Sequence, residues 1–103
     1  MKRILLACGM GASSGFLANA VRKAAKKQGL EVECKAVSDT DINTYAKDYD
    51  IIMLGPHIAY KLEEVKKLVE NTEKKVLLVS KNAYAMLDGA AVLKDALKEL
   101  ENE

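Results

Sequence analysis

The chain has 103 residues, of which 50% are hydrophobic and 30% are charged, and its 16 basic and 15 acidic residues give a net charge of +1. This balance excludes the basic footprint of a nucleic-acid-binding protein, and no apolar run reaches the roughly 18 residues that predict a transmembrane helix. Length and composition therefore predict one globular domain over residues 1–103, with a single modest core.

The two cysteines, Cys8 and Cys34, lie far apart in a lysine-rich chain. This usage predicts free thiols in a reducing cytoplasm. Together with a single histidine, the two cysteines form no ligand cluster, so we expect no metal and no other cofactor.

The first strand and helix are indicated by a change of hydrophobic period. Residues 3–7 form a short, continuous apolar run, which is typical of a strand buried on both faces. A helical pattern follows; it begins near Ser13 or Ser14, either of which can serve as the N-cap, and it closes at Gly29.

The next segment is predicted to be an edge strand. Residues 31–37 alternate apolar and polar residues, which indicates a strand covered on one face only. Cys34 lies on the apolar side of this strand, which indicates a packing residue. Ser38-Asp39 then caps a short, weakly apolar helix that runs to about Lys47.

The second half of the chain again alternates predicted strands with predicted helices. Residues 51–54 predict another buried strand, and Pro56 lies where the next helix begins, which we expect to end near Asn71. Residues 76–79 predict the last strand, followed by a turn or short helix through residues 82–86. A C-terminal helix faces the core with Leu93, Leu97 and Leu100.

Four strands that alternate with helices predict an α/β fold with a parallel sheet and helices on both faces. Right-handed crossovers and the edge-like second strand favour the strand order 2-1-3-4. The strands at 3–7 and 50–54 are then neighbours at the centre. Their carboxyl ends form the topological switch point, where sheets of this kind bind their ligands. Cys8 ends the first of them.

The segment after the first strand carries the strongest chemical signal. Successive backbone amides in a glycine-rich turn, with a helix N-terminus behind them, form an anion site, and the same field favours the thiolate of Cys8. Buried cysteines and glycine-rich turns also occur in domains that never bind phosphate, but the switch-point position favours function. The spacing is neither a Walker loop nor a dinucleotide fingerprint. The predicted phosphate-binding residues are Gly9, Met10, Gly11, Ala12, Ser13 and Ser14.

Three other polar side chains lie near the same predicted edge. His57 could carry a proton, face phosphate or accept a phosphoryl group, or it could be a partly exposed residue of a helix cap region. Tyr60 could add a hydroxyl donor or serve in packing. Asp88 is most simply the N-cap of the last helix. A role as general acid is disfavoured, because a carboxylate directed at phosphate repels it.

The absence of an arginine distinguishes two kinds of phosphocysteine chemistry. A phosphatase that hydrolyses a phosphocysteine usually clamps the equatorial oxygens with a bidentate arginine. No arginine or lysine occurs between Cys8 and Arg22. A loop of amides and hydroxyls can hold the phosphorylated thiol without strongly promoting attack by water, which favours storage and onward transfer.

The chain resembles a known family in three segments: the strand ending in Cys8 with the loop Cys-Gly-Met-Gly-Ala-Ser-Ser, the stretch Leu-Gly-Pro-His-Ile-Ala-Tyr at residues 54–60, and Asp-Gly-x-x-Val-Leu from Asp88. These segments are similar to the lactose/cellobiose-type IIB component of the bacterial phosphoenolpyruvate-dependent sugar phosphotransferase system. The sequence departs from the family pattern at His57, where glutamine is commoner.

The resemblance implies that Cys8 accepts phosphate from a phosphohistidine on the IIA component and passes it to a sugar held by the membrane IIC component. Residues 9–14 would wrap the phosphoryl group. It also implies a fold similar to low-molecular-weight tyrosine phosphatases, which carry an arginine where this chain has Ser14. We expect a cytoplasmic monomer that works transiently at the inner membrane face.

The residues alone leave two alternative functions open. One is a low-molecular-weight phosphatase or arsenate reductase, against which the missing arginine argues. The other is a non-catalytic domain that uses the loop as an anion sensor. The sugar cannot be read from this chain, because we expect the IIC component to select it.

Overall fold

A computed structural model describes residues 2–8 and 12–101, with the backbone alone for residues 12–14. Its centre is a parallel sheet with the strand order β2-β1-β3-β4, which confirms the predicted order. In the register, Ile4 of β1 pairs with Cys34 of β2 and with Ile51 of β3. The strands are β1 (Lys2–Cys8), β2 (Val32–Ser38), β3 (Ile51–Leu54) and β4 (Lys75–Leu78).

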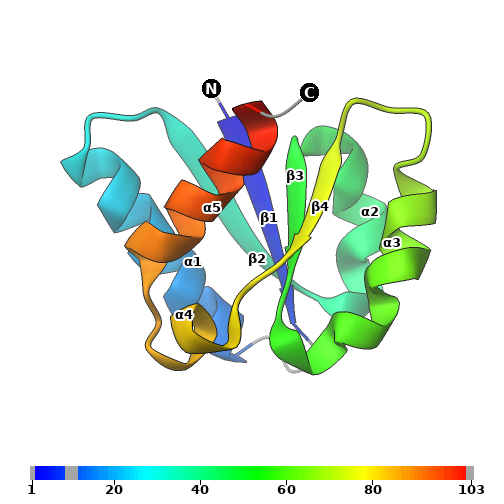
Figure 1. The fold of residues 1–103 in the computed structure, drawn as a ribbon, viewed down its shortest axis with the longest axis horizontal. Coiled ribbons are helices and arrows are strands. Elements are labelled where there is room, and N and C mark those ends of the chain that lie inside the picture. Colours follow the sequence, from blue (N-terminus) through cyan, green and yellow to red (C-terminus); the bar gives the residue numbers. More distant parts are fainter. Residues whose placement is uncertain (1, 9–11, 102–103) are drawn as a thin grey trace.

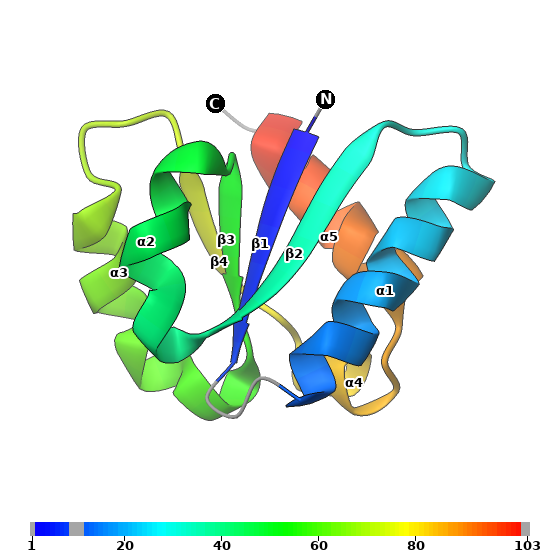
Figure 2. The same ribbon diagram turned by 180° about the vertical axis from the view of Figure 1, so that it is seen from behind.

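Helices cover both faces of the sheet, as Figures 1 and 2 show. One face carries α1 (Ala12–Lys27), α4 (Lys81–Ala85) and α5 (Gly89–Glu101). The other carries α2 (Ile42–Tyr45), α3 (Leu62–Leu68) and the 3₁₀ segments η1 (Asp39–Asp41), η2 (Ala46–Asp48) and η3 (Pro56–Lys61). Among the helices that the structure describes, none is both long enough and apolar enough to cross a bilayer.

The two central strands are buried on both faces. Ile4 and Leu6 of β1 point into the core beneath α1 and α5, whereas Leu5 and Ala7 point into the core beneath α2 and α3. Because successive side chains of a strand alternate between faces, both sets must be apolar. All four are at most 1% exposed, which explains the continuous apolar run in the sequence.

The outer strands follow the edge pattern. In β2, Cys34 is buried while Glu33 and Lys35 are exposed, so the predicted one-sided covering holds over this part of the strand. It fails at Val37, which lies on the face of Glu33 and Lys35 but is buried in the core beneath α2 and α3. The four residues of β4 are half-buried, and the strand begins one residue before the predicted range. Val79, which was predicted to end that strand, follows it and is buried in the core beneath α1 and α5.

The end of α1 is as predicted, but its start is not. Gly29 has φ +71°, its N–H donates to Lys26 O, and Leu30 N–H donates to Ala25 O at 2.9 Å, which together form a Schellman cap. Since α1 begins at Ala12, Ser13 and Ser14 lie inside its first turn, so the prediction of either as N-cap is wrong. β1 ends at Cys8 and α1 begins at Ala12, so the helix has begun before the chain reaches either serine.

The segments after β2 and β3 are less regular than the sequence predicts. Ser38 Oγ accepts from Thr40 N–H at 3.2 Å, which confirms the cap, but the expected helix is divided into η1, α2 and η2. The helix expected from Pro56 begins as the 3₁₀ segment η3, with a break at Ile58 (φ −118°, ψ 30°). It ends at Leu68, short of the expected end near Asn71, because the backbone turns before that residue.

The packing of α5 against α1 generates a test at Gly89. A Cβ placed on Gly89 would lie 2.2 Å from Ala20 C and 2.5 Å from Val21 N, so the two backbones leave no room for a methyl group. We expect Gly89→Ala to lower the free energy of unfolding by about 1–3 kcal/mol, measured by urea denaturation. Gly15→Ala is the matched control: its Cβ meets no described atom within 4 Å, and alanine there should be neutral or stabilising. Equal stability of Gly89→Ala and wild type would contradict the close approach.

Candidate functional site

Cys8 lies at the switch point of the sheet. It is the last residue of β1 and is 3% exposed. From β1 the chain passes to α1 on one face, and from β3 it passes to η3 and α3 on the other. Gly55, directly after β3, donates its N–H to Ala7 O at 2.8 Å and ties the two strand ends together. A ligand at this edge is therefore approached by two diverging connections.

The predicted phosphate loop is only partly within the described residues. Gly9, Met10 and Gly11 lie outside them, so the expected ring of amides stays a prediction. Ala12, Ser13 and Ser14 form the first turn of α1, which lies at the same edge as the end of β1 (Figure 2). The N-terminus of this helix, 16 residues long, brings its positive dipole end to that edge.

The structure brings Tyr84, which the sequence reasoning missed, to Cys8. Its hydroxyl oxygen lies 2.9 Å from the sulfur of Cys8, although 76 residues separate the two. Tyr84 belongs to α4, which Ser80 caps by accepting Ala83 N–H at 3.1 Å. The signal available in the sequence was position: a tyrosine in the short helix that follows the last strand lies at the same sheet edge as Cys8.

His57 contacts Tyr84, the residue whose hydroxyl lies beside the sulfur of Cys8. Its exposed ring stands edge-on to the Tyr84 ring, with the centroids 5.4 Å apart and an interplanar angle of 88°. Edge-to-face packing of this kind is favourable for aromatic rings. The sequence thus placed His57 at the correct edge, and the structure gives it a defined contact with the Tyr84 ring.

The crowding around Cys8 and Tyr84 explains why residue 55 is a glycine. A Cβ there would lie 3.3 Å from Cε2 of Tyr84, 3.4 Å from Ala7 O and 3.5 Å from Cys8 Cβ. Its own φ of −64° and ψ of 155° suit any residue. The glycine is therefore needed for space, since it lets the tyrosine ring pack against the strand end that carries the thiol.

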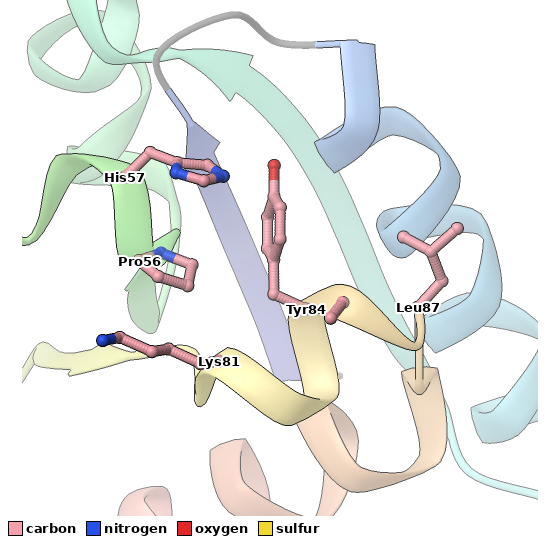
Figure 3. A pocket seen from close by; sticks show the side chains of 6 residues that line it. Pro56, His57, Lys81, Tyr84 and Leu87 are labelled. Atoms are coloured by element: carbon pink, nitrogen blue, oxygen red, sulfur yellow. The ribbon is translucent and has the colours of Figure 1, made fainter.

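A pocket of about 730 Å³ opens beside the Tyr84 ring. Figure 3 shows Tyr84 between the η3 side and the α4–α5 connection, with its hydroxyl directed toward the end of β1. The lining residues are Pro56, His57, Lys81, Tyr84, Ala85 and Leu87. The pocket is mostly apolar, with an ammonium, an imidazole and a phenol as its polar groups.

The remaining candidates have simpler roles. Tyr60 is 75% exposed, and the described residues give it no hydrogen bond, so the suggested hydroxyl donor is not brought to the sulfur. Asp88 Oδ1 accepts Ala91 N–H at 3.1 Å, which confirms it as the N-cap of α5. Within residues 2–8 and 12–101, no three potential His, Cys, Asp or Glu ligands gather around one point.

The second cysteine is a core residue, as expected. Cys34 is 2% exposed among apolar side chains beneath α1 and α5. Burial raises the pKa of its thiol from 9.0 to about 12, and the nearby charge of Arg22 lowers it only in part. This thiol stays protonated at neutral pH and is inert.

Both arginines of the chain are engaged away from Cys8. The guanidinium of Arg22 donates to the carbonyl oxygen of Cys34, and that of Arg3 donates to Asp48 O at 3.4 Å. The described part of the switch point therefore combines a thiol, a phenol and a helix N-terminus without a guanidinium. A thiol so placed can act as a nucleophile once it is deprotonated.

Comparison with known proteins gives one consistent result. Residues 3–95 match the family model for the "PTS system, Lactose/Cellobiose specific IIB subunit". The oligo-beta-mannoside-specific EIIB component of Bacillus subtilis (strain 168) is 29% identical over 103 residues, covering 100% of both chains. The lactose-specific EIICB component of Staphylococcus epidermidis is 31% identical over 101 residues, which are 96% of this chain and 17% of that longer protein.

The fold has a solved counterpart. The lactose-specific IIB domain from Streptococcus pneumoniae superposes with a TM-score of 0.88 at 20% identity, covering 97% of this chain and 98% of that one. This confirms the predicted architecture, which IIB domains share with low-molecular-weight phosphatases.

The buried thiol of Cys34 predicts how stability depends on alkaline pH. In the unfolded chain the thiol ionises near 9.0, whereas in the folded protein it stays protonated to about 12. Between these values the unfolded state has lost a proton that the folded state keeps, so the free energy of unfolding falls by up to about 1.4 kcal/mol per pH unit. Cys34→Ala has no thiol at this position, so its free energy of unfolding does not fall for this reason.

The quantity to measure is the difference in the free energy of unfolding between wild type and Cys34→Ala. At neutral pH we expect Cys34→Ala to be less stable by about 1 kcal/mol or more, because it leaves a small cavity. In urea titrations the gap should narrow as pH rises above 9.0. Burial also raises the pKa of Tyr49, but that residue is present in both proteins, so its effect cancels. A gap that stays constant at alkaline pH would contradict the raised pKa.

Proposed function

Because this chain belongs to the lactose/cellobiose-specific IIB subunits of the phosphoenolpyruvate:carbohydrate phosphotransferase system (PTS), we propose that it is a phosphocysteine carrier. Cys8 accepts a phosphoryl group from a phosphohistidine of a IIA component. It then passes the group to a sugar bound by a membrane IIC component. The protein is therefore a transferase that works with two partners in turn.

One observation carries this proposal above the others. The sulfur of Cys8 lies at the carboxyl end of a central strand, at the switch point of the sheet, with the hydroxyl of Tyr84 2.9 Å away. Cys34, the other thiol, is enclosed in the core and stays protonated. Cys8 is thus the thiol that has both a position for ligands and a polar partner.

The proposed transfer consists of two displacements. In the first, a lone pair of the Cys8 thiolate attacks phosphorus, the S–P bond forms, the N–P bond of phosphohistidine breaks, and its electron pair stays on the imidazole. In the second, a sugar hydroxyl oxygen attacks phosphorus, the O–P bond forms, the S–P bond breaks, and the electron pair returns to sulfur. The hydroxyl proton leaves to a base on the partner side. The protein supplies position and electrostatics.

We propose that residues 9–14 hold the phosphoryl oxygens. Amides of Gly9, Met10 and Gly11 and the first turn of α1 would supply the donors, with hydroxyls from Ser13 and Ser14. The engagement of Arg3 and Arg22 elsewhere supports storage of the phosphoryl group over its hydrolysis. A phosphatase would use a bidentate guanidinium for the charge that develops on the phosphoryl oxygens.

The names of the relatives support the partners but differ in the sugar. An EIICB relative joins a matching segment to a longer chain, which supports a partnership with a IIC component. One relative is named for oligo-beta-mannosides and another for lactose, so we propose a β-linked disaccharide-like acceptor, such as a lactose-, cellobiose- or chitobiose-like sugar. We expect a cytoplasmic monomer of one domain, without a cofactor, that meets IIC at the inner membrane face.

Intact mass spectrometry tests the carrier role. After incubation with phosphoenolpyruvate, the general phosphotransferase proteins and a cognate IIA component, wild type should gain one phosphate that is labile to iodine. Cys8→Ser should gain none, because it lacks the nucleophile, and Cys34→Ala should behave as wild type. Circular dichroism verifies that each variant is folded.

The other outcomes each identify a different function. A phosphate that survives on Cys8→Ser would move the acceptor to His57. Hydrolysis of p-nitrophenyl phosphate without stable phosphorylation would indicate a phosphatase. Folded wild-type protein that gains no phosphate, and whose sugar uptake survives Cys8→Ser, would support the anion sensor.

A further inference from the structure

We propose that Tyr84 is the positioning residue of the transfer: its hydroxyl donates a hydrogen bond to Sγ of Cys8, holds the sulfur as a thiolate and stabilises it as the leaving group. The inference rests on the proposed carrier function and extends it to a second side chain. The observation that supports this inference is the distance of 2.9 Å between Oη of Tyr84 and Sγ of Cys8.

The direction of this hydrogen bond follows from the chemistry of the reactive state. Either atom can donate when the sulfur is a thiol, but a thiol is a weak donor and a phenol is a stronger one. A thiolate has no proton and can only accept. In the nucleophilic state of Cys8, the proton between the two atoms therefore belongs to Tyr84.

Packing holds the ring in the position that this bond requires. The edge of the His57 ring meets the Tyr84 ring on one side, with 5.4 Å between centroids. Gly55 lies against it, where a Cβ would be only 3.3 Å from Cε2 of the tyrosine. Ser80 fixes the start of α4, which carries the tyrosine. In Figure 3 the ring stands upright from α4, with the hydroxyl toward the end of β1.

The hydrogen bond acts differently on the states of the sulfur. A bond to a charged acceptor is about twice as strong as one to a neutral acceptor. As the S–P bond breaks during transfer to the sugar, negative charge returns to Sγ, and the Tyr84 O–H interaction becomes stronger. Only an interaction that is stronger in the transition state accelerates the step. The proton of this hydrogen bond remains on Tyr84 throughout. The thiol proton of Cys8 leaves to solvent before the first attack, and the sugar hydroxyl proton leaves to the base on the partner side.

This assignment gives the site an electrostatic partner without a guanidinium. Arg3 and Arg22 are bonded to the carbonyl oxygens of Asp48 and Cys34, away from the sulfur. A phenol stabilises the thiolate but offers no bidentate clamp for phosphoryl oxygens. The proposed hydrogen bond from Tyr84 therefore stabilises the departing sulfur and does not promote attack of water on the phosphoryl group.

The first test is the pH at which the Cys8 thiol ionises. We would titrate the ultraviolet absorbance of the thiolate in wild type and in Tyr84→Phe, and subtract the same titration of each protein with Cys8→Ser. Cys34 is present in all four proteins and stays protonated to about 12, so it does not contribute. Loss of the hydroxyl should move the midpoint up by about one pH unit.

Tyr60→Phe is the matched control. It removes a hydroxyl from an exposed tyrosine that has no described hydrogen bond, and its midpoint should equal that of wild type. Thermal unfolding of Tyr84→Phe, which keeps the ring, would verify that the fold is intact. An unchanged midpoint in folded Tyr84→Phe would overturn the proposal.

The second test is the rate of phosphoryl transfer from phosphorylated IIA as a function of pH. At neutral pH Tyr84→Phe should be slower by about tenfold, and the deficit should shrink as rising pH forms the thiolate without help. A deficit that is the same at every pH would assign Tyr84 a merely structural role and reject the inference. Phosphorylation of Cys8 in either case leaves the carrier function standing, whereas wild type that is never phosphorylated removes the carrier function itself.

Discussion

The fold depends on the burial of β1 and β3 on both faces. These adjacent strands are apolar from Ile4 to Cys8 and from Ile51 to Leu54, and helices cover them on both sides, since the connections that leave them turn to opposite faces of the sheet. That constraint creates the switch point at their carboxyl ends. Cys8, which ends β1, belongs to neither of the two apolar core clusters, so a reactive group can be placed there at little cost to the core.

The two cysteines show how position determines the chemistry of one residue type. Cys34 occupies the middle of an edge strand beneath two helices, where burial raises its pKa to about 12 and makes it inert. Cys8 is equally shielded from solvent, but its sulfur has a phenol hydroxyl at 2.9 Å. Exposure alone would not separate the two thiols. What separates them is the polar partner and the place at the sheet edge.

The proposed carrier function and the alternative of a phosphatase would differ in the side chains at the switch point. In this chain both arginines are bonded to backbone carbonyls elsewhere. The described groups at the site are a thiol, a phenol, an imidazole edge-on to the phenol ring, and the first turn of α1, with the ammonium of Lys81 in the adjoining pocket. Such a set suits the proposed carrier role, because it offers the sulfur a hydrogen-bond donor and offers phosphoryl oxygens no guanidinium clamp.

The sequence by itself determined the features that local chemistry controls. The closing of α1 at Gly29 and the caps at Ser38 and Asp88 were predictable, because hydrophobic period and short-range hydrogen bonds act over a few residues. The strand order followed from the edge-like pattern of the second strand together with the right-handedness of crossover connections. Local patterns were less reliable at the start of α1, which begins at Ala12, before the chain reaches Ser13 or Ser14.

Only the tertiary structure decided which tyrosine meets the thiol. Tyr60, in the family-like segment near the edge, turned outward to solvent, whereas Tyr84, 76 residues from Cys8, turned inward. Both lie after a strand of the same sheet, so sequence position places each near the carboxyl edge without distinguishing them. The choice depends on the break at Ile58 in η3 and on the course of α4, which together set the direction of each side chain. These backbone details arise from packing between distant segments, and no local pattern contains them.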